Sequence, residues 1–214
     1  MKILIVHATA GAGHSKAAEA IFNGMKKHTA HDVRCVDILN YTNPFYKKLY
    51  PQVYTVLISR FSWLWGFFFW LADIPFLLPL VQGVRRFSNG LTAGDFHTFL
   101  EKENFDYIFT THFFSNEIVS ALKEQKKITS KLICVVTDYD AHSIWLAKNV
   151  DRYAVACTYT EDKLKSFGVP PEKISVTGIP IDEKFSAQPD RASLRVKLGL
   201  DPARFTVLIA TGSF

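Results

Sequence analysis

The sequence predicts an α/β protein built on a Rossmann-like, doubly wound parallel sheet. Short apolar runs rich in β-branched residues alternate along the chain with longer segments whose apolar residues recur at helical spacing. The apolar runs are continuous, which is typical of strands buried on both faces of a parallel sheet. The expected strands are residues 2–7, 33–38, 107–111, 132–137, 153–156 and 174–177.

The expected helices lie between these runs. The first spans residues 15–27 and follows a glycine-containing loop, with Ala17, Ala20, Ile21 and Met25 at helical spacing. The others are residues 92–104, 115–126 and 160–167. The chain has 214 residues, which suffices for one large domain, or for one domain and the start of another.

We expect a domain boundary near residue 188. Residues 1–187 form the first α/β domain, which carries an insertion at residues 41–91. A further helix is expected at residues 189–200, and an apolar strand at 205–210 then runs into a glycine turn. Residues 188–214 are therefore interpreted as the incomplete beginning of a second α/β domain.

Charge and cysteine content narrow the class of protein. The net charge of +5 and the pI near 9.0 favour an anionic partner, which could be nucleic acid, an anionic lipid surface or a phosphorylated ligand. Three widely spaced cysteines in apolar runs predict buried thiols in a reducing compartment and no disulfide framework. The first apolar run is too short for a signal peptide, so we expect a cytoplasmic protein.

The insertion at residues 41–91 does not follow the alternation. Its segment 61–81 is strongly aromatic and has one charge, Asp73, and two prolines, Pro75 and Pro79, which would break a membrane-spanning helix. We expect it to be immersed in one leaflet of a membrane, with cationic residues beside it. The alternative is an aromatic helix pair packed into the domain or against a partner subunit. The expected membrane-contact residues are Trp63, Trp65, Phe67, Phe68, Phe69, Trp70, Arg85 and Arg86, and Lys47, Lys48 and Arg60 are basic residues on the other flank.

The loop after the first strand is the first candidate site. Gly11 and Gly13 let the backbone approach a ligand, and the helix that follows points free N–H groups at an anion. The loop does not match the dinucleotide fingerprint, because Lys16 occupies the third glycine position, although Asp37 could imitate the ribose-binding acid. It also lacks the Gly-Lys-Ser/Thr ending of a Walker loop.

His14 gives this loop a chemical function. An imidazole at a helix N-terminus is favoured in its neutral form, which can act as a base toward a hydroxyl group. The alternative is that His14 only caps or packs the first helical turn.

The loop after residues 132–137 is the second candidate. Loops at the carboxyl ends of parallel strands converge, so Asp138 and His142 could lie near His14. The Asp138-Tyr139-Asp140 string suggests a metal-nucleotide site, but no further carboxylate cluster accompanies it. We expect Asp138 to order the loop or to position an acceptor, and a solvated polar loop is the alternative. No histidine or cysteine spacing predicts a metal site.

Three motifs in order resemble the monogalactosyldiacylglycerol synthase and processive diacylglycerol glucosyltransferase family. They are Gly-Ala-Gly-His-Ser-Lys-Ala-Ala-Glu-Ala-Ile at residues 11–21, Val136-Thr137-Asp138 with His142 and Trp145, and Val-Thr-Gly-Ile-Pro-Ile at residues 176–181. The resemblance covers essentially the whole chain. It implies the N-terminal, acceptor-binding domain of a GT-B glycosyltransferase, truncated at the start of the C-terminal domain that binds the UDP-sugar.

The resemblance also implies roles for individual residues. His14 would be the general base, Gly11 and Gly13 would face the donor phosphates, and Gly212 and Ser213 would open the second glycine loop. The acceptor pocket would contain Asp138, His142 and Trp145. The implied reaction is inverting transfer of a hexose from UDP-glucose or UDP-galactose to diacylglycerol, with no cofactor and no obligatory metal ion.

The expected location is the cytoplasmic face of a membrane, whose anionic surface the protein binds peripherally. No nucleic acid partner is expected. The chain alone is expected to be inactive. Two alternatives remain open: transfer to a polyprenyl-linked or other lipid acceptor, and a non-catalytic Rossmann-type membrane-binding module.

Overall fold

A computed structural model describes residues 1–9, 12–72, 83, 92–187, 190–201 and 203–209. Within these residues, six strands form one sheet in the order β2-β1-β3-β4-β5-β6, and each neighbouring pair is parallel. The predicted doubly wound sheet is confirmed, and each predicted strand is present with ends within two residues. The strands are β1 (Lys2–His7), β2 (Asp32–Asp37), β3 (Tyr107–Thr110), β4 (Lys131–Val135), β5 (Arg152–Val155) and β6 (Ile174–Val176).

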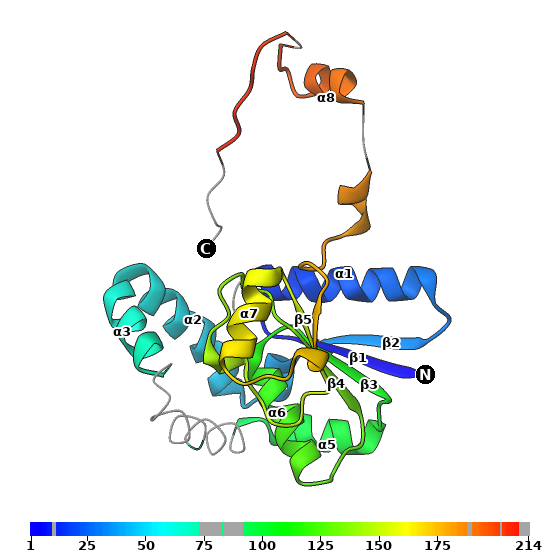
Figure 1. Cartoon of the computed structure of the whole chain (residues 1–214), viewed down its shortest axis with the longest axis vertical. Helices are drawn as coiled ribbons and strands as arrows, with labels where there is room; N and C mark the ends of the chain where they lie inside the picture. Colours follow the sequence, from blue (N-terminus) through cyan, green and yellow to red (C-terminus); the bar gives the residue numbers. More distant parts are fainter. Residues whose placement is uncertain (10–11, 73–82, 84–91, 188–189, 202, 210–214) are drawn as a thin grey trace.

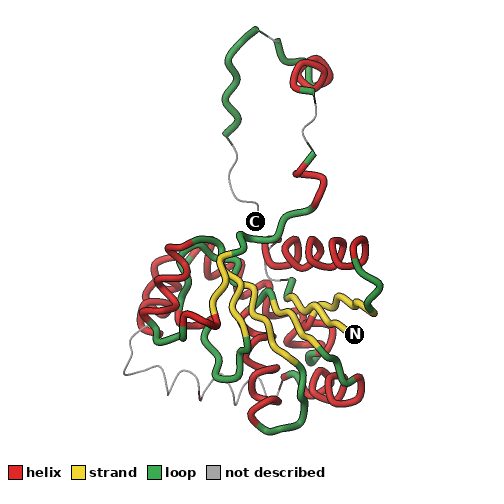
Figure 2. Tube along the Cα trace, turned by 45° about the vertical axis from the view of Figure 1, so that its right-hand side comes forward, coloured by secondary structure: helices red, strands yellow, loops and turns green. Residues whose placement is uncertain are grey.

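Helices cover both faces of the sheet. Alternate residues of β1 point to opposite faces, so Ile3 and Ile5 pack with Ala18 of α1, while Leu4 and Val6 belong to the larger core under α5 and α6. Figures 1 and 2 show the strands between α1 on one side and α5 and α6 on the other. The helices that follow the predicted pattern are α1 (Ala12–His28), α5 (Gly94–Glu103), α6 (Phe113–Glu124) and α7 (Thr158–Ser166).

Local sequence explains where these helices begin and end. Small residues on the buried face of α1, among them Ala17 and Ala18, let the helix approach the sheet closely, and basic residues in its last turn complement the helix dipole. Asn104 ends α5 in the left-handed conformation, with φ of 48°. Short 3-10 helices connect other elements: η1 (Ile38–Tyr41), η2 (Ser143–Trp145) and η3 (Pro171–Lys173).

The strand order creates a switch point beside β1. Strand β2 lies on one side of β1 and β3 on the other, so the connections leave β1 in opposite directions, and in open α/β sheets ligands bind at the carboxyl ends of the strands beside such a point. The loops after β1, β3 and β4 therefore meet at one edge of the sheet. We call this edge the carboxyl edge.

The described part of the insertion contains the helices α2 (Pro44–Arg60) and α3 (Ser62–Ala72), which lie beside the sheet and which we call the aromatic arm. The two helices contact each other, and Figure 1 shows α3 on the side of α2 away from the strands. The side chains of Trp63 and Trp70 are 72% and 62% exposed, and Phe67 is also exposed. These three side chains are therefore not packed into the domain, which was one form of the alternative interpretation of the insertion. No helix in the described part of the chain is both long and apolar enough to cross a membrane.

Some predicted membrane-contact residues cannot be placed. Arg85 and Arg86 lie outside the described residues, and so do the side chains of Trp65, Phe68 and Phe69. Among the cysteines, Cys134 is buried as expected, whereas Cys35 and Cys157 are only half-buried, and all three are free.

The chain after β6 leaves the sheet. It forms η4 (Glu183–Ser186) and then α8 (Arg191–Lys197), which is the helix expected at residues 189–200 and stands apart from the strands in Figure 1. The prediction of a strand at residues 205–210 was wrong for the described residues 205–209, which have no regular structure. Phe205 is 92% exposed. A strand needs a neighbour to pair its backbone groups, and none of the six described strands pairs with this segment. The domain boundary near residue 188 stays a prediction.

Candidate functional site

His14 lies in the first turn of α1, at the carboxyl edge of the sheet. Its ring Nδ1 is 2.7 Å from the main-chain oxygen of Thr111 and 2.9 Å from Oγ1 of Thr137. The hydroxyl group of Thr111 also donates a hydrogen bond of 2.9 Å to the main-chain oxygen of His14. The residues that follow β3 and β4 therefore fix both the backbone and the ring of a residue that follows β1.

These contacts determine which ring nitrogen of His14 carries hydrogen. A carbonyl oxygen can only accept, so the 2.7 Å contact with Thr111 requires Nδ1 to be the donor. With Nδ1 protonated, the hydroxyl oxygen of Thr137 is a second acceptor for the same N–H group. Nε2 is then the nitrogen whose lone pair can take a proton when the ring is neutral.

The surroundings of His14 favour that neutral form. Burial lowers the pKa of the His14 imidazole from its ordinary value, and this effect outweighs the others. The carbonyl of Thr111 and the negative charge of Asp138 raise the pKa, while His7 lowers it slightly. His14 thus combines a base-competent tautomer with groups that stabilise the imidazolium after a proton is taken up.

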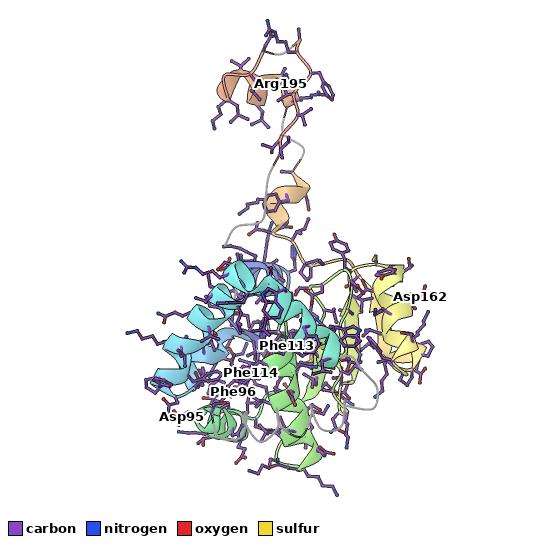
Figure 3. The ribbon with its side chains drawn as sticks, turned by 90° about the vertical axis from the view of Figure 1, so that its left-hand side faces the viewer. Asp95, Phe96, Phe113, Phe114, Asp162 and Arg195 are labelled. Atoms are coloured by element: carbon purple, nitrogen blue, oxygen red, sulfur yellow. The ribbon has the colours of Figure 1, made fainter. Side chains whose placement is uncertain are left out.

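Two aromatic side chains enclose the His14 ring. The ring of His112 contacts it edge-on with centroids 4.6 Å apart, and the indole of Trp145 lies 6.0 Å away. His112 caps α6, because its Nδ1 accepts a hydrogen bond of 3.1 Å from the backbone N–H of Phe114. Figure 3 shows Phe113 and Phe114 at the first turn of α6. The contact between Tyr46 of α2 and Phe114, with centroids 5.9 Å apart, brings the base of the aromatic arm to the same turn.

Trp145 is a core residue that holds Asp138. The Trp145 side chain is 1% exposed, and its indole N–H donates a hydrogen bond of 2.7 Å to Oδ2 of Asp138. The main-chain oxygen of Trp145 accepts from the side-chain amide of Asn116 at 2.9 Å, which fixes it against α6. Asp138 and Trp145 therefore lie beside His14; the sequence led us to expect this of Asp138, whereas Trp145 was named only through the family resemblance. Their role in an acceptor pocket stays a prediction.

His142 has a structural contact at the start of η2. It is buried, and its Nδ1 accepts a hydrogen bond of 3.0 Å from the backbone N–H of Ile144. Capping η2 helps to place Trp145, which is the last residue of that turn. The predicted role of His142 in acceptor binding is untested.

The glycine loop can be described only in part. Gly13 belongs to α1, and a Cβ atom added there would meet no heavy atom within 4 Å, so packing does not require a glycine. Open space beside a helix N-terminus is compatible with the approach of a ligand. Gly11, Gly212 and Ser213 lie outside the described residues.

Asp37 orders the beginning of the same loop. Its Oδ2 accepts from the hydroxyl of Thr9 at 2.6 Å, and its Oδ1 accepts from the backbone N–H of Leu39 at 3.0 Å. Beside it, at the end of β1, Nδ1 of His7 is buried without a hydrogen-bond partner in the described structure, and burial lowers the pKa of His7. The carboxylate of Asp37 thus has local partners in the protein itself.

The two acids of the Asp138-Tyr139-Asp140 string point to different partners. Asp138 is held by Trp145, whereas Oδ1 of Asp140 is 3.4 Å from Nζ of Lys163 and 3.4 Å from the hydroxyl of Tyr159. Among the residues that the structure describes, no group of three or more His, Cys, Asp or Glu side chains is arranged to hold a metal ion.

Sequence reasoning did not single out Thr111 and His112, and it treated Thr137 only as part of a motif. All three follow the carboxyl ends of strands. The rule that such loops converge could have marked them as neighbours of His14, but it could not have specified the contacts.

The fold is a doubly wound, Rossmann-like parallel sheet of the type found in GT-B glycosyltransferases. The lipopolysaccharide outer core galactosyltransferase WaaB shares it, with a TM-score of 0.50 and 13% identity, over 89% of this chain and 50% of that one. A model of the monogalactosyldiacylglycerol (MGDG) synthase family matches residues 14–181. The chain therefore belongs to this family.

Curated relatives cover the whole chain. It is 29% identical to the processive diacylglycerol beta-glucosyltransferase of Bacillus pumilus, over 99% of this chain and 54% of the relative. It is 28% identical to the enzyme of the same name from Staphylococcus epidermidis, over 100% of this chain and 53% of the relative. The chain thus spans about half the length of the curated relatives it matches.

Proposed function

We propose that the protein containing this chain transfers a hexose from a UDP-sugar to diacylglycerol at a membrane surface, and that this chain supplies the general base. The observation that carries the proposal is the hydrogen bond from Nδ1 of His14 to the main-chain oxygen of Thr111, which makes Nε2 the proton acceptor. Membership of the MGDG synthase family and the likeness to processive diacylglycerol beta-glucosyltransferases support the class of acceptor.

The proposed chemistry is a single displacement. The free hydroxyl group of diacylglycerol approaches Nε2 of His14, which takes its proton as the oxygen attacks the anomeric carbon of the sugar. The bond between that carbon and the phosphate oxygen breaks, and its electron pair leaves with UDP. Attack opposite the leaving group converts an α-linked donor into a β-glycoside, so the configuration is inverted.

Groups around His14 stabilise the imidazolium that this step forms. The positive ring keeps its Nδ1–H bond to the Thr111 carbonyl, and a charged donor strengthens that bond. The carboxylate of Asp138 attracts the positive charge and is kept in place by the indole of Trp145. Burial alone would make His14 a weak base, so these groups restore part of its basicity.

The donor phosphates fit the start of α1. The first turn has no acidic residue, and the helix N-terminus presents backbone N–H groups with the positive end of the helix dipole. Diphosphate carries negative charge at this point during the transfer. The open space beside Gly13 leaves room for its approach.

The aromatic arm supplies the membrane contact in this proposal. Trp63, Phe67 and Trp70 expose aromatic surface on α3, and Lys47, Lys48 and Arg60 are exposed on α2. Exposed tryptophans beside basic side chains suit the interface of an anionic leaflet. The base of the arm reaches the turn that carries His112, so a lipid acceptor would lie close to His14.

The test uses the whole protein with labelled UDP-glucose or UDP-galactose and liposomes that contain diacylglycerol. His14→Ala is expected to lower turnover by about a hundredfold to ten-thousandfold, because the general base is lost. Circular dichroism and liposome flotation should be unchanged. His31→Ala, a histidine outside the site, is the matched control and should retain turnover.

Two results would overturn the proposal. If His14→Ala retains turnover, His14 is not the general base. If the whole protein has no transferase activity, the non-catalytic binding module is favoured. A parallel reaction with a polyprenyl-linked acceptor distinguishes the acceptor class, since a strong preference for that acceptor would contradict diacylglycerol as the substrate.

A further inference from the structure

The N–H group at Nδ1 of His14 points at two oxygen atoms from different loops. The main-chain oxygen of Thr111 lies 2.7 Å away and Oγ1 of Thr137 lies 2.9 Å away. The first contact belongs to the backbone and survives any side-chain substitution at Thr111. The second depends on one hydroxyl group, so its contribution can be removed by mutation.

We propose that Thr137 is a positioning residue for the transfer reaction, whose hydroxyl oxygen holds the His14 ring so that Nε2 faces the acceptor. This inference rests on the proposed function. Thr137 touches neither substrate in the proposed step and acts through His14. A second acceptor on the same N–H group restricts rotation about the Cβ–Cγ bond, because turning the ring breaks both hydrogen bonds at once.

The backbone beside Thr137 is held firmly enough for this role. Val136 is fully buried, and its backbone N–H donates a hydrogen bond of 2.9 Å to the main-chain oxygen of Ala154 at the end of β5. On the other side, Asp138 is fixed by its 2.7 Å hydrogen bond from the Trp145 indole. Thr137 thus lies between two anchored neighbours, and its hydroxyl group is presented to His14 from a rigid segment.

The hydroxyl group also acts on the basicity of His14. An acceptor at Nδ1–H stabilises the imidazolium more than the neutral ring, because a charged donor forms the stronger hydrogen bond. The other titratable groups that face His14 are His7 at the end of β1, His112 after β3 and Asp138 after β4. Removing the Thr137 hydroxyl leaves these three groups in place, so its own effect can be measured.

The first experiment needs no enzymatic activity. Nitrogen-15 NMR of this chain reports which ring nitrogen of His14 carries hydrogen and at what pH the ring titrates. The native chain should show hydrogen on Nδ1 in the neutral ring. Thr137→Val should keep hydrogen on Nδ1, because the main-chain oxygen of Thr111 still accepts it, but should lower the titration midpoint of the ring. Thr137→Ser should behave as the native chain does.

A threonine outside the site provides the matched control. Thr98 is exposed on α5, and its hydroxyl group donates to the carbonyl of Gly94 in the same helix. Thr98→Val should leave the His14 signals unchanged. An unchanged titration midpoint in Thr137→Val would overturn the inference, provided that circular dichroism shows a native fold.

The second experiment measures kinetics in the whole protein. Thr137→Val should lower kcat about tenfold, with little change in KM for the UDP-sugar, because one hydrogen bond to the base is lost. The acid limb of the kcat profile should move to lower pH, since a weaker base stays unprotonated to lower pH. Thr137→Ser should restore both values, which a merely structural role for the threonine methyl group would not predict.

The two proposals fail in different ways. Native kinetics in Thr137→Val together with an inactive His14→Ala would overturn the positioning role and leave His14 as the base. Turnover retained by His14→Ala would overturn the proposed function, and with it any role of Thr137 in the reaction, whatever the NMR result.

Discussion

Trp145 and Trp63 are the same residue type in opposite surroundings. Trp145 is 1% exposed in the core below the carboxyl edge, and its indole N–H is bonded to Asp138. Trp63 is 72% exposed on the aromatic arm. Burial with a satisfied N–H group is how proteins use tryptophan for stability, whereas several exposed aromatic side chains on one helix indicate a surface that meets something else. The two regions should therefore respond differently to the same kind of mutation.

The largest expected difference is in stability. Trp145→Ala should lower the free energy of unfolding by about 3–5 kcal/mol, because it leaves a cavity in the core and releases Asp138. Trp63→Ala should change it by less than about 0.5 kcal/mol, since the side chain is mostly in solvent. Urea denaturation of both variants measures the difference. Similar losses in the two would contradict the contrast between core and arm.

The next effect is on catalysis at the carboxyl edge. Asp138→Asn keeps an oxygen that can accept from the Trp145 indole but removes the negative charge that raises the pKa of His14. Turnover of the whole protein should fall roughly tenfold or more, and the acid limb of its pH profile should move to lower pH. The unfolding free energy should stay near the native value. An unchanged pH profile would show that Asp138 does not act on the base.

A smaller effect is expected for membrane binding by the arm. Replacing Trp63 and Trp70 with Ser should weaken flotation with anionic liposomes by roughly tenfold for each tryptophan, because less aromatic surface enters the interface. Turnover with a soluble, short-chain acceptor should be preserved. Binding that persists in the double variant would favour a partner subunit over a membrane as the contact of the arm.

The smallest effect is on the pH dependence of stability. Burial lowers the pKa of His7 and of His14 below the ordinary value of 6.5, so the unfolded chain takes up protons first as the pH falls. The free energy of unfolding should therefore decrease as the pH drops below about 6.5. Replacing both residues with Gln should flatten this dependence. The described arm, residues 44–72, contains no histidine, so its liposome binding should not follow the same curve.

Much of the fold could be predicted because its signals are local. The continuous apolar run of β1 and the helical spacing of Ala17 and Ala20 in α1 need no knowledge of the rest of the chain. The prediction of a strand at residues 205–209 failed because strand formation also needs contacts that are not local. An apolar run predicts a strand only where neighbours exist to pair with it, and pairing depends on distant parts of a chain.

The candidate site was predictable in its residues but not in its contacts. His14 and Asp138 could be selected because polar residues after strands of a parallel sheet tend to converge. Trp145 could be expected at the site, but its burial and its hydrogen bond to Asp138 follow from packing against Asn116. His142 shows the same limit, because its contact with the backbone of Ile144 depends on the course of one turn.

The sequence by itself determined the alternation of strands and helices, the position of the glycine loop, and the aromatic character of the arm. These properties depend on residues that are close together in the chain. The tertiary structure decided the strand order, and with it the neighbours of His14. Thr111 and Thr137 lie 97 and 123 residues away in sequence, and they meet one imidazole nitrogen because β3 and β4 come to lie beside β1. That meeting, which fixes the tautomer of the proposed base, is a property of the folded sheet.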